Sequence, residues 1–148
     1  MADHRLEKVG RGRAAPSGFT LLELLVVLAI LALIATLAVP RVISALGKAK
    51  TDVARIQIES LATTLDLYRL DMGDYPAQEQ GLRALVDRPA DVQGWSGPYL
   101  TKADGLTDPW GHPYRYRYPG QHGPFDLYSL GSDNAEGGEG EASDVVNW

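Results

Sequence analysis

The feature that most constrains this chain is a predominantly apolar run over residues 19–39. As a helix this run would extend about 31 Å at roughly 1.5 Å per residue, which matches the roughly 30 Å hydrocarbon core of a membrane. Cleaved secretory signals have shorter apolar cores, and a chain of 148 residues is too small to surround a helix that is apolar on every side. We therefore predict a membrane-spanning helix, in preference to a cleaved signal or a buried core helix.

The charged residues that flank the run suggest an orientation. Four basic residues precede it, namely Arg5, Lys8, Arg11 and Arg13. By the positive-inside bias, the N-terminus is predicted to be cytoplasmic and the C-terminal part to lie outside the cytoplasm. Three basic residues after the run oppose this bias, namely Arg41, Lys48 and Lys50.

Composition narrows the function classes. The chain has no cysteine, which excludes disulfides, a thiolate zinc site and a cysteine nucleophile. The net charge of -5 argues against a nucleic-acid partner. Five acids lie in the last sixteen residues, namely Asp133, Glu136, Glu139, Glu141 and Asp144.

One carboxylate, Glu23, lies near the start of the apolar run. An ionised side chain inside a membrane needs a cation or hydrogen-bond donors close by. Glu23 is therefore either an interfacial carboxylate that reaches the headgroups or a carboxylate with a partner. The run contains no lysine or arginine, so a cationic partner would come from another chain or from a new amino terminus made by cleavage.

The sequence GFTLLE, residues 18–23, resembles the type IV prepilin processing motif. A basic leader precedes it, and the apolar run follows. The resemblance implies that a prepilin peptidase cleaves after Gly18 and methylates the new amino group of Phe19. The ammonium group of Phe19 would then lie four residues from Glu23, and in a helical filament a neighbouring chain would offer the same group. The pairing of Glu23 within or between subunits stays open.

A second periodic segment follows the apolar run. Apolar residues recur at three- to five-residue steps, at Val42, Leu46, Ala49, Val53, Ile56, Leu61, Leu65, Tyr68 and Met72. Opposite charges stand at helical spacing in the pairs Lys48/Asp52, Arg55/Glu59 and Asp66/Arg69. We predict one helix over about residues 20–72, with a kink or local melting near Pro40 or Gly47, ended by Gly73.

The remaining residues are rich in turn signals. We predict a short helix over residues 79–86 and two strands, 114–118 and 124–130, joined by a turn at 119–123. The expected fold class is α+β, with a long N-terminal helix packed on a small antiparallel sheet of two to four strands and extended loops, as in type IV pilins. His112 and His122 lie in turns and Ser129 lacks a nucleophile-elbow context, so we predict no enzyme.

The acidic C-terminal residues allow two interpretations. Glycine and glutamate favour a solvated tail, whereas several carboxylates closed by the apolar Val145, Val146 and Trp148 favour a hard-cation site. The spacing is not that of an EF-hand, because Ala135 and Gly137 stand where Asp or Asn is expected. Spacing alone leaves both interpretations open.

Further blocks extend the resemblance over the mature chain. YPAQEQGLRAL, GPYL, DPWGHPY, FDLYSLGSDN and GGEGEASDVVNW follow GFTLLE in this order, and together they are similar to the major, G-type pseudopilins of type II secretion systems. The resemblance implies a calcium ion bound by Asp133 and Asp144, with the Leu130 carbonyl and Ser143 as further ligands. The three glutamates of the loop are expected to be solvated.

The resemblance also implies a function without an active site. Subunits would leave the inner membrane and polymerise into a short periplasmic filament that drives folded proteins across the outer membrane. Partners would be other copies, minor pseudopilins, prepilin peptidase and a membrane platform with a cytoplasmic ATPase. The alternatives are a type IV pilin for adhesion, motility or competence, and a membrane-anchored periplasmic enzyme.

The same resemblance divides the chain into four expected parts. Residues 1–18 would form the leader, and residues 19–40 the transmembrane and filament-core helix. Residues 41–73 would form an amphipathic helix. Residues 74–148 would form loops, the small sheet and the calcium-type loop.

Overall fold

The computed structural model describes residues 18–90 and 92–148. The predicted leader lies outside the described residues, apart from Gly18. The chain divides into a unit that ends at Val39 and a folded unit, Pro40–Trp148. Helix α1, Leu21–Met72, supplies residues to both.

Helix α1 is continuous over 52 residues, so the predicted long helix is confirmed. Pro40 lies inside it, and the helix shows no local melting at Pro40 or at Gly47. The helix begins after Thr20, whose hydroxyl accepts the Glu23 backbone N–H at 3.2 Å. At its other end the N–H of Gly73 donates to the Arg69 carbonyl at 2.8 Å, which closes the last turn.

The apolar part of α1 up to Val39 has no buried residue. Among the described residues, α1 is the one helix long and apolar enough to cross a membrane. Apolar side chains that are exposed on every side of a helix need a lipid or protein environment.

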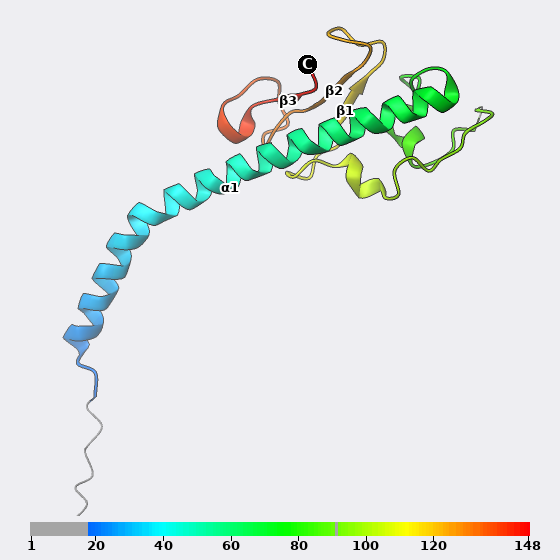
Figure 1. The fold of residues 1–148 in the computed structure, drawn as a ribbon. Helices are drawn as coiled ribbons and strands as arrows, with labels where there is room; N and C mark the ends of the chain where they lie inside the picture. Colours follow the sequence, from blue (N-terminus) through cyan, green and yellow to red (C-terminus); the bar gives the residue numbers. More distant parts are fainter. Residues whose placement is uncertain (1–17, 91) are drawn as a thin grey trace, which may run out of the picture. The chain divides into compact units, whose positions relative to one another are not determined.

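The folded unit has its core along the second part of α1 (Figure 1). The buried apolar residues of α1 are Ala54, Ile58, Leu61, Leu65 and Tyr68. They pack with buried residues from later in the chain, which include Leu82, Leu85, Tyr114, Phe125, Leu127 and Val145. The core therefore unites the helix with both the loops and the sheet.

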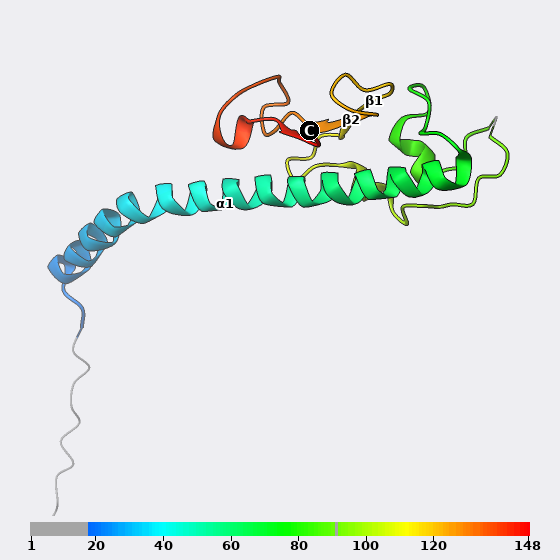
Figure 2. The ribbon, with the colours of Figure 1, turned by 45° about the horizontal axis from the view of Figure 1, so that its top comes forward.

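Three short strands form one antiparallel sheet in the order β1-β2-β3. They are β1 (Arg115–Arg117), β2 (Asp126–Ser129) and β3 (Val145–Val146). Both ribbon views place β1 and β2 alongside α1 (Figure 2). Central strand β2 pairs Leu127 with Tyr116 of β1 and Tyr128 with Val146 of β3. This arrangement confirms the predicted α+β fold class.

The short helix predicted over residues 79–86 is a 3-10 helix, Gly81–Leu85. Gly81 enters it with a φ of 56°, a left-handed conformation outside the α-helical region. The other 3-10 helices are Ala103–Leu106 and Gly140–Ala142.

The apolar stripe of α1 is only partly buried. Val42 and Leu46 are 57% and 60% exposed, because the loops and sheet cover α1 mainly from Ala54 onward. Ile56 lies within the covered part of the helix but is 65% exposed, so it is not on the buried face. Within residues 18–90 and 92–148, none of the three predicted helical charge pairs forms an ion pair.

Tyr75 explains one of these missing pairs. Its hydroxyl donates to Asp66 at 2.8 Å and accepts from Arg69 at 3.4 Å. Asp66 and Arg69 are therefore connected through Tyr75 and not directly.

Candidate functional site

The predicted processing residues lie before α1. Gly18 and Phe19 have no regular secondary structure, and Phe19 is 74% exposed. The Gly18–Phe19 peptide bond is thus outside the helical hydrogen bonding of α1. A bond in an exposed, non-helical segment is open to a peptidase.

Glu23 lies in the first turn of α1. A carboxylate there interacts favourably with the partial positive charge of the helix N-terminus. Thr20 and Glu23 also have the spacing of a capping box, and the observed Thr20 contact is one half of that motif. Sequence reasoning missed this local role, although the Thr-x-x-Glu spacing could have shown it.

The C-terminal loop, residues 130–144, leaves β2 and returns as β3. Its two ends meet where the Ser132 N–H donates to the Glu141 carbonyl at 2.9 Å. Gly131 has a φ of 66°, and a Cβ there would lie 2.7 Å from the Glu141 carbonyl oxygen. Only glycine suits this close approach of two backbones.

A buried carboxylate holds the turn before β1 against the base of this loop. Asp108 accepts the backbone N–H groups of Trp110 at 3.0 Å and His112 at 2.8 Å through Oδ1. Its Oδ2 accepts the hydroxyl of Ser129 at 2.5 Å. The ring of His112 lies 3.1 Å from the Gly131 carbonyl.

His112 lies in a turn, as predicted, and its side chain is 29% exposed. The contacts of Asp108 define the role of Ser129. Its hydroxyl donates to Asp108 and the residue is fully buried, which leaves no nucleophile directed at solvent.

The structure brings together two of the four predicted calcium ligands. Leu130 and Asp144 line one cavity of about 190 Å³, which Glu136 also lines. Asp133 and Ser143 are not among its lining residues. Asp133 is exposed and accepts the Ala135 N–H at 3.1 Å.

Asp144 carries the feature most relevant to a cation. Its Oδ2 accepts the Gly137 N–H at 3.0 Å, while its Oδ1 is buried without any hydrogen-bond partner. A buried carboxylate oxygen without a partner is costly, and a hard cation would satisfy it. In the part of the chain that the structure describes, no three His, Asp or Glu side chains converge as a metal cluster. Backbone carbonyls would therefore have to complete any ligand set.

His122, Asp126 and Trp148 also line this cavity. The ring of His122 stacks on Trp148 with centroids 4.1 Å apart, and its Nδ1 lies 3.3 Å from Asp126. Burial disfavours the charged form of Asp126, but hydrogen bonds from the backbone of Gln121 and His122 and from the His122 ring outweigh it and lower the pKa of Asp126. His122 thus holds the last residue, Trp148, against the β1–β2 turn.

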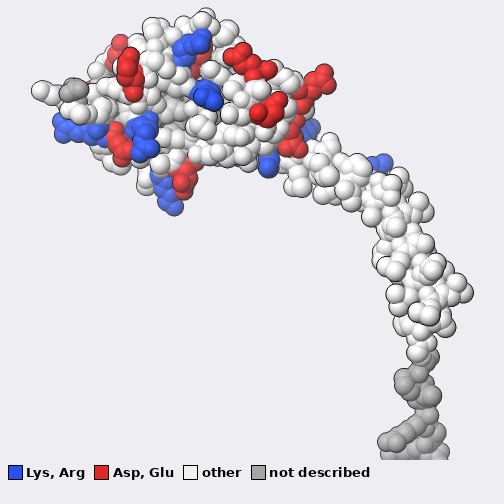
Figure 3. Space-filling model, turned by 180° about the vertical axis from the view of Figure 1, so that it is seen from behind, with Lys and Arg blue, Asp and Glu red and all other residues white. Residues whose placement is uncertain are grey.

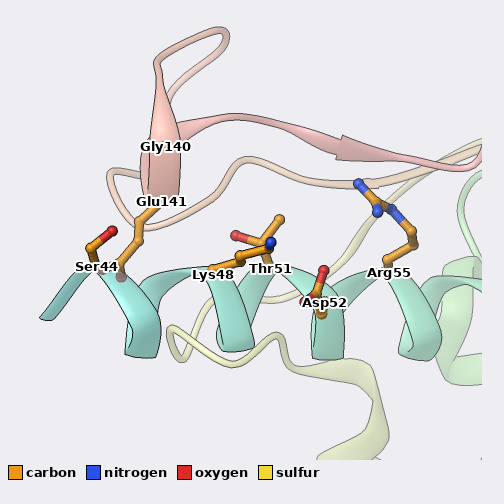
Figure 4. Close-up of a pocket in the computed structure, with 7 residues that line it drawn as sticks. All are labelled: Ser44, Lys48, Thr51, Asp52, Arg55, Gly140 and Glu141. Carbon is orange, nitrogen blue, oxygen red and sulfur yellow. The ribbon is translucent and has the colours of Figure 1, made fainter. Parts of the chain in front are cut away.

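One loop glutamate departs from the expectation of a solvated charge. Glu141 is half-buried, and its carboxylate accepts the indole N–H of Trp110 at 3.3 Å. Its side chain lies directly on Gly47 of α1. Figure 4 shows this side chain directed from the loop towards the helix. Glu136 and Glu139 are exposed, as expected.

Comparisons with known proteins place this arrangement in a family. The family model described as "Type II secretion system (T2SS), protein G" matches residues 41–148. The model of the prokaryotic N-terminal methylation motif matches residues 13–39.

Relatives resemble the chain over nearly all of its length. Type II secretion system core protein G of Pseudomonas aeruginosa is 47% identical over 140 residues, covering 92% of this chain and 97% of the relative. The Vibrio cholerae protein of the same description is 41% identical over 135 residues, covering 89% and 91%. The crystal structure of the major pseudopilin of enterohaemorrhagic Escherichia coli matches with a TM-score of 0.57 and 37% identity, over 68% of this chain and 88% of that one.

Proposed function

The chain belongs to the type II secretion system protein G family, and we propose that it acts as the major pseudopilin, the repeating subunit of a pseudopilus. The observation that carries this proposal is the 47% identity to a core protein G of which this chain covers 97%. The relatives reported above are all type II secretion proteins, which favours a pseudopilin over an adhesion, motility or competence pilin. A family of structural subunits also favours a non-enzymatic role.

The proposed life of the subunit begins in the inner membrane. The apolar part of α1 would span it, with the N-terminus cytoplasmic and the folded unit in the periplasm. Prepilin peptidase would cleave after Gly18 and methylate Phe19. The methylation-motif match and the exposed, non-helical peptide bond support this step.

Assembly would then depend on Glu23. The amino group of Phe19, in the same or a neighbouring chain, is the cation that we propose for it. The platform proteins and ATPase would supply the energy, minor pseudopilins would join the filament, and the filament would drive folded proteins through the outer membrane. On the face shown in Figure 3, acidic and basic side chains are interspersed over the folded unit. Such a surface does not suit a nucleic-acid partner.

Secretion by a strain that lacks its own G subunit tests the function. Expression of this chain should restore export of a folded substrate and produce filaments of the subunit. Restored adhesion or motility without secretion would instead support the type IV pilin alternative.

We also propose a calcium ion in the C-terminal loop, held by Asp144 and the Leu130 carbonyl with Asp133 and Ser143. The buried, partnerless Oδ1 of Asp144 supports that residue as a ligand, and Leu130 lines the same cavity as Asp144. When bound, the ion would offset the negative charge of the loop carboxylates. The role of the four proposed ligand residues is to keep the two ends of the loop together.

A calcium titration of residues 41–148 tests this site. The fragment contains every residue of the hydrophobic core, so it is expected to fold. Calcium at about 100 times its dissociation constant should stabilise the fragment by about 2.7 kcal/mol, seen as a higher melting temperature in calorimetry.

Three variants sharpen the result. Asp144→Asn and Asp133→Asn should abolish or weaken the response, whereas Glu139→Gln, an exposed residue of the same loop, should retain it. An unchanged melting temperature of the wild-type fragment would remove the calcium site.

A further inference from the structure

Glu141 connects three segments that are distant in sequence. It belongs to the 3-10 helix Gly140–Ala142 within the C-terminal loop. Its carboxylate accepts from Trp110, and its side chain occupies the space in which any side chain at position 47 would begin. Figure 4 shows it directed from the loop onto α1.

The contact is isolated on its part of the helix. Among residues 41–53 of α1, Gly47 is the only buried residue, and burial resumes at Ala54. Two surface grooves, of about 570 Å³ and 400 Å³, lie along this stretch, and Glu141 lines both. The helix turn around Gly47 is therefore held to the rest of the folded unit mainly by one side chain.

A glycine inside a helix is itself a cost, about 1 kcal/mol relative to alanine. At position 47 a larger residue would displace the Glu141 carboxylate. Gly47 thus lowers the local stability of the helix, and its lack of a side chain makes room for the Glu141 side chain.

The main chain of Glu141 links this contact to the candidate ion site. The carbonyl of Glu141 accepts the N–H of Ser132, the residue before Asp133. Asp144 lies three residues after Glu141 in the sequence. A loop held in one conformation at Leu130 and Asp144 also holds Glu141 in place. A loosened loop frees Glu141 to leave the helix.

We propose that Glu141 is a positioning residue that fastens the C-terminal loop to α1, and that cation binding in the loop is transmitted through it to residues 44–51. The second part rests on the proposed calcium site, whereas the first does not. The consequence is that the occupied loop stiffens the helix segment that follows the apolar part of α1 in sequence.

Hydrogen exchange measured by mass spectrometry tests the proposal on the mature full chain in detergent. In the wild type, calcium chloride should slow exchange in both the C-terminal loop and residues 44–51, relative to EDTA. In Glu141→Ala, calcium should still slow the loop, but residues 44–51 should exchange on the order of tenfold faster than in the wild type, as expected for loss of one hydrogen bond to a charged group. Their response to calcium should disappear.

Three further variants separate positioning from a general loss of stability. Glu139→Ala makes the same charge change at an exposed residue of the same loop and should behave as wild type. Glu141→Gln keeps the shape and an acceptor for Trp110, so it should largely retain the coupling. Gly47→Ala leaves the loop intact and raises helix propensity, yet it should abolish the calcium response of residues 44–51.

The outcomes distinguish the two proposals. Calcium-dependent slowing at residues 44–51 that persists in Glu141→Ala and in Gly47→Ala overturns the coupling while leaving the calcium site intact. Absence of any calcium effect on the wild-type loop overturns the calcium site and the coupling together. The proposal that Glu141 fastens the loop to α1 is then tested by hydrogen exchange in EDTA. Equal exchange rates of residues 44–51 in Glu141→Ala and Glu139→Ala would refute it.

Discussion

Ser129, the last residue of β2, donates its hydroxyl to Asp108 at 2.5 Å, and both residues are almost completely buried. Asp108 in turn holds the backbone of the turn that carries Trp110. This single contact ties the turn before β1 to the strand from which the C-terminal loop departs. The Trp110 indole is thereby placed where Glu141 meets it.

Removing that hydroxyl should destabilise the folded unit. Ser129→Ala leaves Asp108 Oδ2 buried without its donor, and such a loss costs about 1–3 kcal/mol, more for a charged group. Denaturant unfolding of residues 41–148 measures the change. Ser132→Ala, at an exposed position of the adjoining loop, should stay within about 0.5 kcal/mol of wild type; equal losses for the two variants would contradict the assigned role of Ser129.

Processing depends on the bond after Gly18. Gly18→Ala adds a side chain at the cleavage position, where the structure has nothing within 4 Å of the new Cβ. The folded chain should therefore be unaffected, while prepilin peptidase should leave a full-length species. Intact-mass spectrometry of membrane extracts checks this result, and a normal mature, methylated mass would refute the proposed cleavage site.

A filament assembly assay should separate the helix-capping role of Thr20 from the charge-pairing role of the Glu23 carboxylate. Glu23→Ala keeps the Thr20 contact, because that contact uses the Glu23 backbone N–H, but it removes the carboxylate. Membrane insertion should persist and filaments should be absent in electron micrographs. Thr20→Ala removes only the cap, at a cost of about 1 kcal/mol, and should still assemble; filaments of wild-type length from Glu23→Ala would argue against the charge pairing.

The pKa of Asp126 predicts an acid limit to stability. Its pKa is lowered in the folded state, so its contribution is fully present above the unfolded value of about 3.9 and is lost as pH falls through the lower folded value. The melting temperature of the wild-type fragment should therefore decrease below about pH 4. Asp126→Asn should be less stable at neutral pH and should show a smaller decrease; parallel curves for the two proteins would contradict this assignment.

Two leucines of α1 that are two residues apart should differ in how much they contribute to the free energy of unfolding. Leu65 is fully buried, whereas Leu67 is 52% exposed. Leu65→Ala should lower the free energy of unfolding by about 2–5 kcal/mol, and Leu67→Ala by much less. Urea unfolding of both variants is the measurement, and similar losses would mean that the assigned helix face is wrong.

Much of this architecture was predictable because its signals are local. A membrane-length apolar run and a following three- to four-residue period predict α1, since a helix repeats its faces at that interval. The alternation around Tyr116 and the apolar segment around Leu127 predicted the positions of β1 and β2, which form the expected hairpin. The GFTLLE motif is readable for the same reason, as its residues are consecutive.

The remainder depended on contacts between distant segments. The period of α1 did not show where burial begins, because Ala54 and Ile58 are buried by loops and strands far along the chain. Nor did it show that Glu141 lies on Gly47, since a loop glutamate in an acidic sequence is solvated unless another segment supplies a donor. The sequence alone determined the helix, the hairpin and the processing motif, because neighbouring residues encode them. The tertiary structure decided which carboxylates are buried and that the Glu141 side chain packs on Gly47. Only packing between distant segments removes water from such carboxylates.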